Sequence, residues 1–308
     1  MTDGTAERPA LATTTAHVAV TMPCYNRPAG LQRTIDCLRA QTHADWTALI
    51  GDNASTDPAV EEVARRACRE DARFTYLRRE HNIGVGANFG DLAARGRGDY
   101  FMWAADDDVL EPEFMAECLR LFADNPSAGL VAPTIDNINR QDAHIRSYPG
   151  YSRFSSTPTP EGIRAFLLDP EVMGKQVMLY GLYRMPALQA AIAEYWSASD
   201  FDLWGGDMVF VYGFICRYAV VGTDKVLLHK RVATDATDIS IGHHPNWYFV
   251  PRREYPSYVQ RHIAVSPNAE FAAAVKAALR KRYWTSRLYR YLARLGIEPK
   301  FTPDGAAK

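Results

Sequence analysis

The sequence has little of three features that would each point to a particular class of protein. Its five cysteines stand far apart without a C-x-x-C pair, which argues against a zinc site or a disulfide framework and favours a reducing compartment. Its longest apolar stretch, Met208 to Val221, is too short for a membrane span and contains Arg217. A net charge of −1 gives no electrostatic reason to expect nucleic-acid binding. These absences predict a soluble, cytoplasmic protein that binds no nucleic acid.

The start of the sequence also lacks the apolar core of a signal peptide. Residues 1 to 16 are polar and rich in Thr and Ala, and we expect a flexible tail there. With 308 residues, 47% of them hydrophobic, the chain is long enough for one large globular domain or two modest ones.

Strand and helix patterns alternate along the first part of the chain. Short β-rich runs predict strands at residues 18–22, 46–50, 74–77, 100–103 and 129–132. Amphipathic segments between them predict helices at residues 28–40, 57–69, 84–94 and 111–122. This alternation predicts an α/β fold in which helices cover both faces of a parallel sheet.

Three adjacent carboxylates, Asp106 to Asp108, follow the expected strand at 100–103. One interpretation is a helix N-terminus, where acidic side chains satisfy free amides and the helix dipole favours negative charge. The other is a divalent cation, because Mg²⁺ and Mn²⁺ prefer hard oxygen ligands. Two further polar loops, residues 23–27 and 51–57, follow the first two expected strands. Since ligands bind beyond the carboxyl ends of the strands in such sheets, this shared edge favours a metal site.

The second part of the chain carries weaker patterns and no internal repeat. Residues 134–160 are rich in Ser, Thr, Asn and Pro, which predicts a linker or long loop. We expect helices near 161–168 and 186–195, an apolar helical run that Asp207 opens, a strand at 225–228 and a mobile segment at 232–245.

Five segments occur in the order typical of one enzyme family. They are "VAVTMPCYNRP", "LIGDNASTD", "HNIGVGANFG", "DYFMWAADDDVLEP" and "WGGDMVF". Together they make the chain resemble a family-2 glycosyltransferase of the GT-A fold over roughly residues 17 to 230. The resemblance implies a Rossmann-like, mainly parallel sheet flanked by helices, with a helical C-terminal extension.

The chain is accordingly expected to have four parts. They are a flexible tail at 1–16, a nucleotide-sugar-binding α/β half at 17–133, an acceptor-binding and catalytic half of the same domain at 134–230, and a mobile loop with a basic amphipathic helix at 231–308.

The resemblance also implies which residues contact the nucleotide sugar. They are Pro23, Tyr25, Asn26, Arg27, Asp52, Asn82, Gly84, Asn88 and Asp106. Tyr25 would stack near the pyrimidine, although a tyrosine after a strand is more often a packed aromatic. Asp52 would accept a hydrogen bond from N3–H of uracil or thymine, and an Asx turn explains this residue about as well. Gly84 would let the backbone approach the ligand, whereas Asn82 suits a helix cap equally.

The family's D-x-D-D pattern is incomplete here, because Ala105 replaces its first acid. The resemblance implies that Asp107 holds Mn²⁺ or Mg²⁺ through the donor diphosphate, which would neutralise charge as the glycosidic bond breaks. Asp106 would lie near the ribose or share the cation, and Asp108 would cap the next helix. His229 comes where the family often has a residue near the diphosphate. It is either a weak metal ligand or a structural histidine.

Asp207 is the expected catalytic base. Family members that invert the anomeric centre use one carboxylate of the acceptor half to deprotonate the attacking hydroxyl, and Gly206-Asp207 matches the pair that carries it. The alternative is an ordinary helix N-cap after the turn at Gly205-Gly206.

The resemblance implies a metal-dependent, inverting glycosyltransferase that moves one sugar from a UDP- or dTDP-sugar to a hydroxyl of a glycan or lipid-linked acceptor in bacterial surface polysaccharide synthesis. The processive members' Q-x-x-R-W motif is absent from the sequence, which favours the addition of one sugar. Two alternatives remain. One is a catalytically inactive nucleotide-sugar-binding protein, for which Ala105 is the hint. The other is a sugar-nucleotide pyrophosphorylase, although residues 23–27 lack its Gly-rich phosphate loop.

The C-terminal segment, Asn268 to Leu295, combines helical spacing of apolar residues with seven basic residues and one acid. With Trp284, Tyr289 and Tyr291 it has the pattern of a helix that lies on an anionic membrane surface, on the inner face of the plasma membrane. The alternative is a helix packed on the catalytic domain with a solvated basic face.

Overall fold

The computed structural model describes residues 16–106, 108–148, 150–169, 174–231 and 252–295. Its strands are β1 (Val18–Cys24), β2 (Trp46–Asp52), β3 (Phe74–Arg78), β4 (Tyr100–Trp103), β5 (Val109–Leu110), β6 (Ala128–Ile138), β7 (His144–Ser147), β8 (Leu182–Arg184) and β9 (Ala219–Arg231). Its α-helices are α1 (Pro28–Arg39), α2 (Pro58–Glu70), α3 (Val85–Arg95), α4 (Phe114–Asp124), α5 (Pro160–Leu168), α6 (Met185–Ser199), α7 (Gly206–Ile215), α8 (Tyr255–Ala264) and α9 (Ala269–Arg294).

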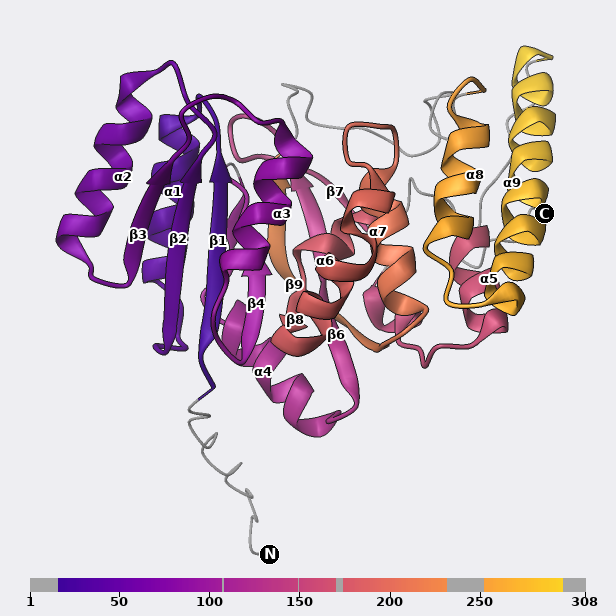
Figure 1. Ribbon diagram of the computed structural model, residues 1–308, viewed down its shortest axis with the longest axis horizontal. Helices are drawn as coiled ribbons and strands as arrows, with labels where there is room; N and C mark the ends of the chain where they lie inside the picture. The colour runs from indigo at the N-terminus through magenta and orange to yellow at the C-terminus, as the bar shows by residue number, and fades with distance from the viewer. Residues whose placement is uncertain (1–15, 107, 149, 170–173, 232–251, 296–308) are drawn as a thin grey trace, which may run out of the picture.

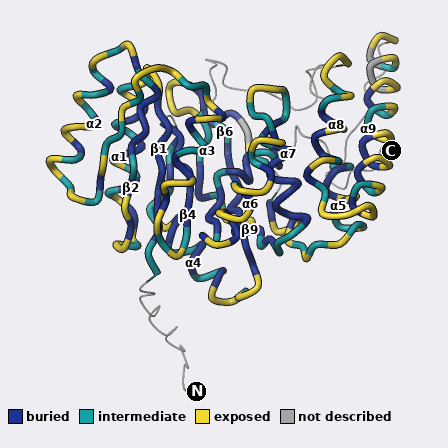
Figure 2. Tube along the Cα trace, viewed as in Figure 1, coloured by how far each residue is buried: buried dark blue, intermediate teal, exposed yellow. Residues whose placement is uncertain are grey.

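These strands form one mixed sheet in the order β3-β2-β1-β4-β8-β6-β9-β5, with β7 beside β6 (Figure 1). The first four strands are parallel, and β1 lies between β2 and β4. All seven residues of β1 are buried because helices cover both faces of the sheet there (Figure 2). The expected α/β fold with a mainly parallel sheet is confirmed.

The helices divide between the two faces of the sheet. In Figure 1, α3, α6 and α7 lie in front of the sheet and α1 lies behind it. α1 packs against α2, and its end is joined to the start of α4, where the amide of Met115 donates to the side chain of Gln41. Pro28 and Pro58 stand in the first turns of α1 and α2, where proline's missing N–H costs no hydrogen bond.

Two short strands that the sequence did not indicate change the direction of the sheet. β8 lies between β4 and β6 and is antiparallel to both, and β5 is antiparallel to β9. With two and three residues, they are too short to show a periodic pattern.

The prediction of a linker at 134–160 is wrong, because the end of β6, the strand β7 and a short 3-10 helix, Tyr151–Phe154, lie within it. β6 continues to Ile138, and the boundary expected after residue 133 therefore lies inside a strand shared by both halves. Thr134 is buried although it is polar, because its hydroxyl donates to the carbonyl of Thr223 and accepts from the amide of Tyr151.

α5, α8 and α9 pack together at one end of the molecule, beyond α7 (Figure 1). The expected C-terminal helix is confirmed, and its first half is buried through Phe271, Val275 and Leu279. None of the helices in the described ranges is both long and apolar enough to cross a membrane. The segment 232–245, expected to be mobile, lies outside the described residues.

Candidate active site

The polar loops expected at one edge of the sheet do meet there, because β1, β2, β3 and β4 are parallel and end at the same edge. We call this edge the carboxyl rim. Figure 1 shows the ends of β1 and β2 pointing to the same side as the loop between α6 and α7.

Asp106 joins the loop after β4 to the loop after β1. Its Oδ2 accepts from the amide of Tyr25 at 3.1 Å, and its Oδ1 accepts from Nη1 of Arg27 at 3.2 Å. Asp106 is buried, whereas the Tyr25 residue is 41% exposed. The structure therefore brings three of the expected nucleotide-sugar residues together, with an aromatic ring open to a ligand.

Asn26 joins the loop after β1 to the loop after β2. Its side-chain oxygen accepts from the amides of Thr56 and Asp57 at 2.8 and 3.0 Å, and its own amide donates to Oγ of Ser55 at 3.0 Å. Asn26 has a φ of 55°, a conformation that asparagine tolerates better than most residues. Asn26 thus links the two loops through hydrogen bonds.

Asp52 ends β2 and has no exposed surface. Its Oδ1 accepts from the amide of Ser55, three residues on, at 2.8 Å, so the carboxylate closes a local turn that is one residue longer than the expected Asx turn. Its Oδ2 accepts from the hydroxyl of Tyr76 at 2.8 Å and from Nη1 of Arg78 at 2.9 Å. Direct contact between Asp52 and a base therefore requires one of these donors to move. Arg78 was not among the expected site residues, although it ends the third strand at the same edge of the sheet as the other rim residues.

The loop before α3 is held by paired asparagines. Asn82 Oδ1 accepts from Nδ2 of Asn53 at 3.0 Å and from the amide of Gly84 at 2.9 Å. Gly84 is the N-cap of α3 with a φ of 87°, a left-handed value that favours glycine, so the alternative of capping by Asn82 is wrong. Asn88 is buried and donates to the carbonyl of Gly51 at 3.1 Å.

The expected metal ligand Asp107 lies outside the described residues. Its neighbour Asp108 is buried and does not cap a helix, because α4 begins at Phe114. Asp108 accepts instead from Nζ of Lys230 at 3.3 Å and from the amide of Arg231 at 3.1 Å. The prediction of a capping Asp108 is wrong because β5 and a turn separate this carboxylate from the helix.

His229 lies on β9 opposite Val109 of β5. Its Nε2 is 2.7 Å from Oε1 of Glu111, which orients the ring toward that carboxylate. Within the described part of the chain, no three His, Cys, Asp or Glu side chains gather as a metal site.

The pKa of Cys24, at the end of β1, is affected by the carboxylates of the rim. Burial raises the pKa of its thiol far above the usual range, and the carboxylates of Asp52 and Asp106 raise it further. The thiol is therefore neutral at physiological pH and is not a candidate nucleophile.

Asp207 lies in the first turn of α7 and is half-buried. Its Oδ1 accepts from the amide of Met208 at 2.7 Å, and Gly205 occupies the N-cap, so the N-cap alternative is wrong. The preceding loop lies against the start of α3, because a Cβ added to Gly86 would come within 2.7 Å of Cβ of Phe201. The fold therefore places the chain before Asp207 beside the loop before α3.

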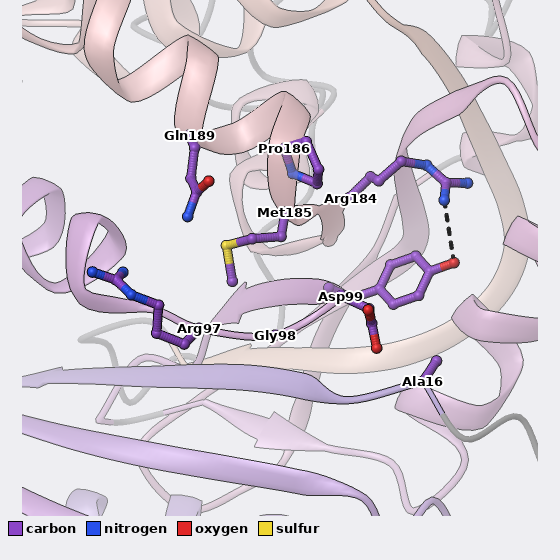
Figure 3. A pocket seen from close by; sticks show the side chains of 9 residues that line it. Ala16, Arg97, Gly98, Asp99, Arg184, Met185, Pro186 and Gln189 are labelled. Atoms are coloured by element: carbon purple, nitrogen blue, oxygen red, sulfur yellow. Dashed lines mark hydrogen bonds between the residues drawn. The ribbon is translucent and has the colours of Figure 1, made fainter.

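A cavity of about 710 Å³ lies at the opposite edge of the sheet (Figure 3). It is lined by residues that precede β1 and β4, such as Ala16 and Asp99, and by Arg184, which donates to the hydroxyl of Tyr100. None of the expected site residues lines it, so we assign it no part in the reaction.

The model for glycosyl transferase family 2 matches residues 19–185, more than half of the chain. The chain belongs to glycosyl transferase family 2. This match covers the first half of the expected domain and extends through β8, so it includes every expected nucleotide-sugar-binding residue and Asp107, and it ends before Asp207 and His229.

Several curated proteins are similar to this family-2 chain. An uncharacterized glycosyltransferase of Methanocaldococcus jannaschii is 25% identical over 213 residues, which are 68% of this chain and 73% of that protein. The O-antigen biosynthesis protein RfbC of Myxococcus xanthus is 26% identical over 37% of this chain and 9% of its own length. The chain spans between 9% and 37% of the first three curated relatives that it matches.

The fold is shared with solved glycosyltransferase structures. TarS of S. aureus in complex with UDP has a TM-score of 0.57 at 16% identity, covering 94% of this chain and 95% of that one. A mannosyltransferase of Pyrobaculum calidifontis in complex with GDP-Man and Mn²⁺ has a TM-score of 0.54 at 14% identity, covering 93% and 76%. The expected GT-A fold is confirmed.

Proposed function

We propose that this family-2 protein transfers one sugar from a UDP- or dTDP-sugar to a hydroxyl of a glycan or lipid-linked acceptor. The observation that carries this proposal is the carboxyl rim, where Tyr25, Arg27 and Asp106 form one cluster beside Asp52. The loop that leads to Asp207 contacts the same rim. The UDP complex of TarS supports a uridine donor, and RfbC supports a role in surface polysaccharide synthesis.

In the proposed reaction Asp207 is the base and the anomeric centre inverts. The acceptor hydroxyl gives its proton to the Asp207 carboxylate while its oxygen bonds to C1 of the sugar. The nucleoside diphosphate leaves with the electron pair of the broken C1–O bond. A half-buried carboxylate suits this role because the amide of Met208 holds one of its oxygens while the side chain is still accessible to a hydroxyl.

We further propose that the enzyme uses a divalent cation and that Asp107 is the residue that binds it. Asp106 and Asp108 already accept hydrogen bonds from cationic side chains, and Nε2 of His229 faces Glu111. These three residues do not form a ready coordination shell, and His229 would need its other nitrogen or a rotation to bind a metal. A bound Mn²⁺ or Mg²⁺ would supply charge neutralisation for the leaving diphosphate.

The first experiment is calorimetry with UDP and with dTDP, each with and without Mn²⁺, followed by a screen of nucleotide sugars for hydrolysis and transfer. Metal-dependent binding together with turnover of one donor supports the proposal. Nucleotide binding without turnover of any sugar donor would instead support a catalytically inactive binding protein.

We also propose that α9 holds the enzyme at an anionic membrane surface on the inner face of the plasma membrane, where a lipid-linked acceptor would lie. The second half of α9 carries an exposed apolar stripe. Its members are spaced four, three and four residues apart and are each more than half exposed: Trp284, Leu288, Tyr291 and Leu295. Exposed basic residues accompany it along the helix: Lys276, Arg280, Lys281, Arg287 and Arg294.

This half of α9 fits a lipid surface better than it fits a second copy of itself. The helix has seven Lys and Arg and one Glu, whereas the whole chain has 35 basic and 36 acidic residues. Two such helices side by side would repel each other, while an anionic headgroup layer would attract each one. Trp and Tyr beside basic residues are typical of helices that lie in the membrane interface.

A further inference from the structure

One arginine of α8 donates hydrogen bonds to backbone carbonyls of the loop between α6 and α7. Arg261 is buried, and its Nη1 donates to the carbonyls of Ser199 and Asp200 at 2.7 and 3.1 Å. Its Nη2 donates to the carbonyl of Trp204 at 2.6 Å. One guanidinium therefore binds both ends of the five-residue turn that follows α6.

This segment, residues 199–206, has little support of its own. Its internal backbone hydrogen bonds join Leu203 to Asp200 and Gly206 to Leu203, both at 3.2 Å. Asp200 has a φ of 50°, a left-handed conformation that costs energy for a residue other than glycine. Ser199 is the last residue of α6, so its carbonyl has no partner within the helix, and Arg261 binds it together with the carbonyl of the C-cap residue Asp200.

A second residue of α8 fixes the end of the same segment. The ring of Tyr258 is fully buried and lies against Gly205, where an added Cβ would come within 2.6 Å of the ring. Trp204 packs on the same ring, with 4.8 Å between ring centroids. Gly205 has a φ of 75°, so its conformation as well as its contact favours glycine.

The charge of Arg261 is also placed near the expected base. Burial lowers the pKa of Arg261, while the carboxylates of Asp200, Glu254 and Asp207 and the hydroxyl of Tyr258 act in the opposite direction. The family match ends at residue 185, so α8 contributes this group from outside the matched region.

We propose that Arg261 is a positioning residue of the transfer reaction: it sets the 199–206 segment so that Asp207 meets the acceptor hydroxyl at the carboxyl rim. This inference rests on the proposed role of Asp207. It makes α8 part of the catalytic architecture, because the segment before the base takes its shape from a helix about sixty residues later in the sequence. Loss of such support costs turnover, since a displacement of about 1 Å at the reacting atoms can lower a rate about 100-fold.

The chain offers a matched control in Arg217, which also ties α8 to the preceding fold. Its Nη1 donates to the carbonyls of Gly213 and Val265 at 3.0 and 2.7 Å, and its Nε donates to Glu194 at 3.1 Å. Arg217 lies beyond the C-terminal end of α7, away from the 199–206 segment. None of these three partners belongs to the 199–206 segment, so the loss of Arg217 removes a comparable set of hydrogen bonds and leaves those of Arg261 in place.

The test compares Arg261→Gln and Arg261→Lys with Arg217→Gln in the full chain. We expect kcat to fall about 10- to 100-fold in both Arg261 variants, with the donor KM and the affinity for UDP within about twofold of wild type. Hydrogen exchange should quicken in peptides that cover residues 199–206. Arg217→Gln should lower the melting temperature by a similar amount while kcat and that exchange stay near wild type.

Equal kcat values in the Arg261 and Arg217 variants would overturn the inference, as would unchanged exchange at 199–206. A parallel loss of UDP affinity would show that Arg261 supports the whole fold instead. If the wild-type protein transfers no sugar, the proposed function fails, and hydrogen exchange still decides whether Arg261 orders the segment. Arg261→Lys retains a cation, so it keeps the test usable if Arg261→Gln does not fold.

Discussion

The donor side and the acceptor side of the carboxyl rim are held together in different ways. On the donor side, Asp52, Asn26 and Asp106 each bind groups from the neighbouring loops, and all of these groups come from the first 106 residues. On the acceptor side, Arg261 and Tyr258 reach the chain before Asp207 from a helix far along the sequence. The donor side is thus built within the region that the family model matches, whereas the acceptor side depends on C-terminal helices outside that region.

An aromatic stack connects the two sides. Trp103, which ends β4 just before the aspartates, lies 5.8 Å from Trp196 of α6, and Trp196 lies 4.2 Å from Phe201 in the acceptor segment. Trp196 also donates to the carbonyl of Gly86 at 3.2 Å, which brings α3 into the same contact. A shift of the acceptor segment would therefore change the packing around Trp103, at the end of the strand that precedes the aspartates.

The largest effect is expected from Asp107→Asn on the donor side. A neutral amide cannot balance the charge of a divalent cation, so metal-dependent UDP binding and transfer should both nearly disappear. Wild-type protein in EDTA should lose activity in the same way and regain it when Mn²⁺ is added. Full activity of the variant, or of the wild type in EDTA, would contradict the metal assignment.

The next effect is expected from Asp207→Asn on the acceptor side. Turnover should fall by about two to four orders of magnitude, the usual span for a lost general base, while UDP affinity stays near normal. Asp202→Asn, which changes a neighbouring exposed carboxylate, is the matched control. If Asp202→Asn loses turnover and Asp207→Asn keeps it, the base has been assigned to the wrong carboxylate.

A smaller effect is expected on stability from Asp52→Asn. The amide group would face donors of Tyr76 or Arg78, and we expect the free energy of unfolding to fall by about 1–3 kcal/mol. Denaturation in urea measures this change, with Glu62→Gln, an exposed carboxylate of the same half, as the control within about 0.5 kcal/mol of wild type. Equal stability of the two variants would show that the buried network contributes little.

The smallest effect is expected from Arg280→Gln on α9. Loss of one exposed charge should weaken binding to vesicles by about 1 kcal/mol, roughly fivefold, at low salt. Sedimentation with phosphatidylcholine vesicles, with and without phosphatidylglycerol, measures this change, and Arg65→Gln on α2 is the control. If the wild-type protein stays in the supernatant at low salt, α9 belongs to the fold alone.

The sequence predicted the strands of the donor side because each of them follows from a local apolar pattern. The strands ending at Cys24, Asp52 and Trp103 were visible as apolar runs, and parallel strands must bring their carboxyl ends to one edge. The exception is Asp108, which was taken for a helix cap. Its partners, Lys230 and Arg231, come from a strand more than one hundred residues away.

By itself, the sequence determined the α/β class, the rim and its polar residues apart from Arg78, since alternating patterns and turn residues act over a few positions. Only the tertiary structure decided which of those polar groups are already occupied by partners, as for Asp52 and His229. Only the tertiary structure also showed that Arg261 binds the segment before Asp207. It likewise showed that the first half of α9 is packed and that the second half carries exposed apolar side chains. These features depend on contacts between distant segments, which no local pattern encodes.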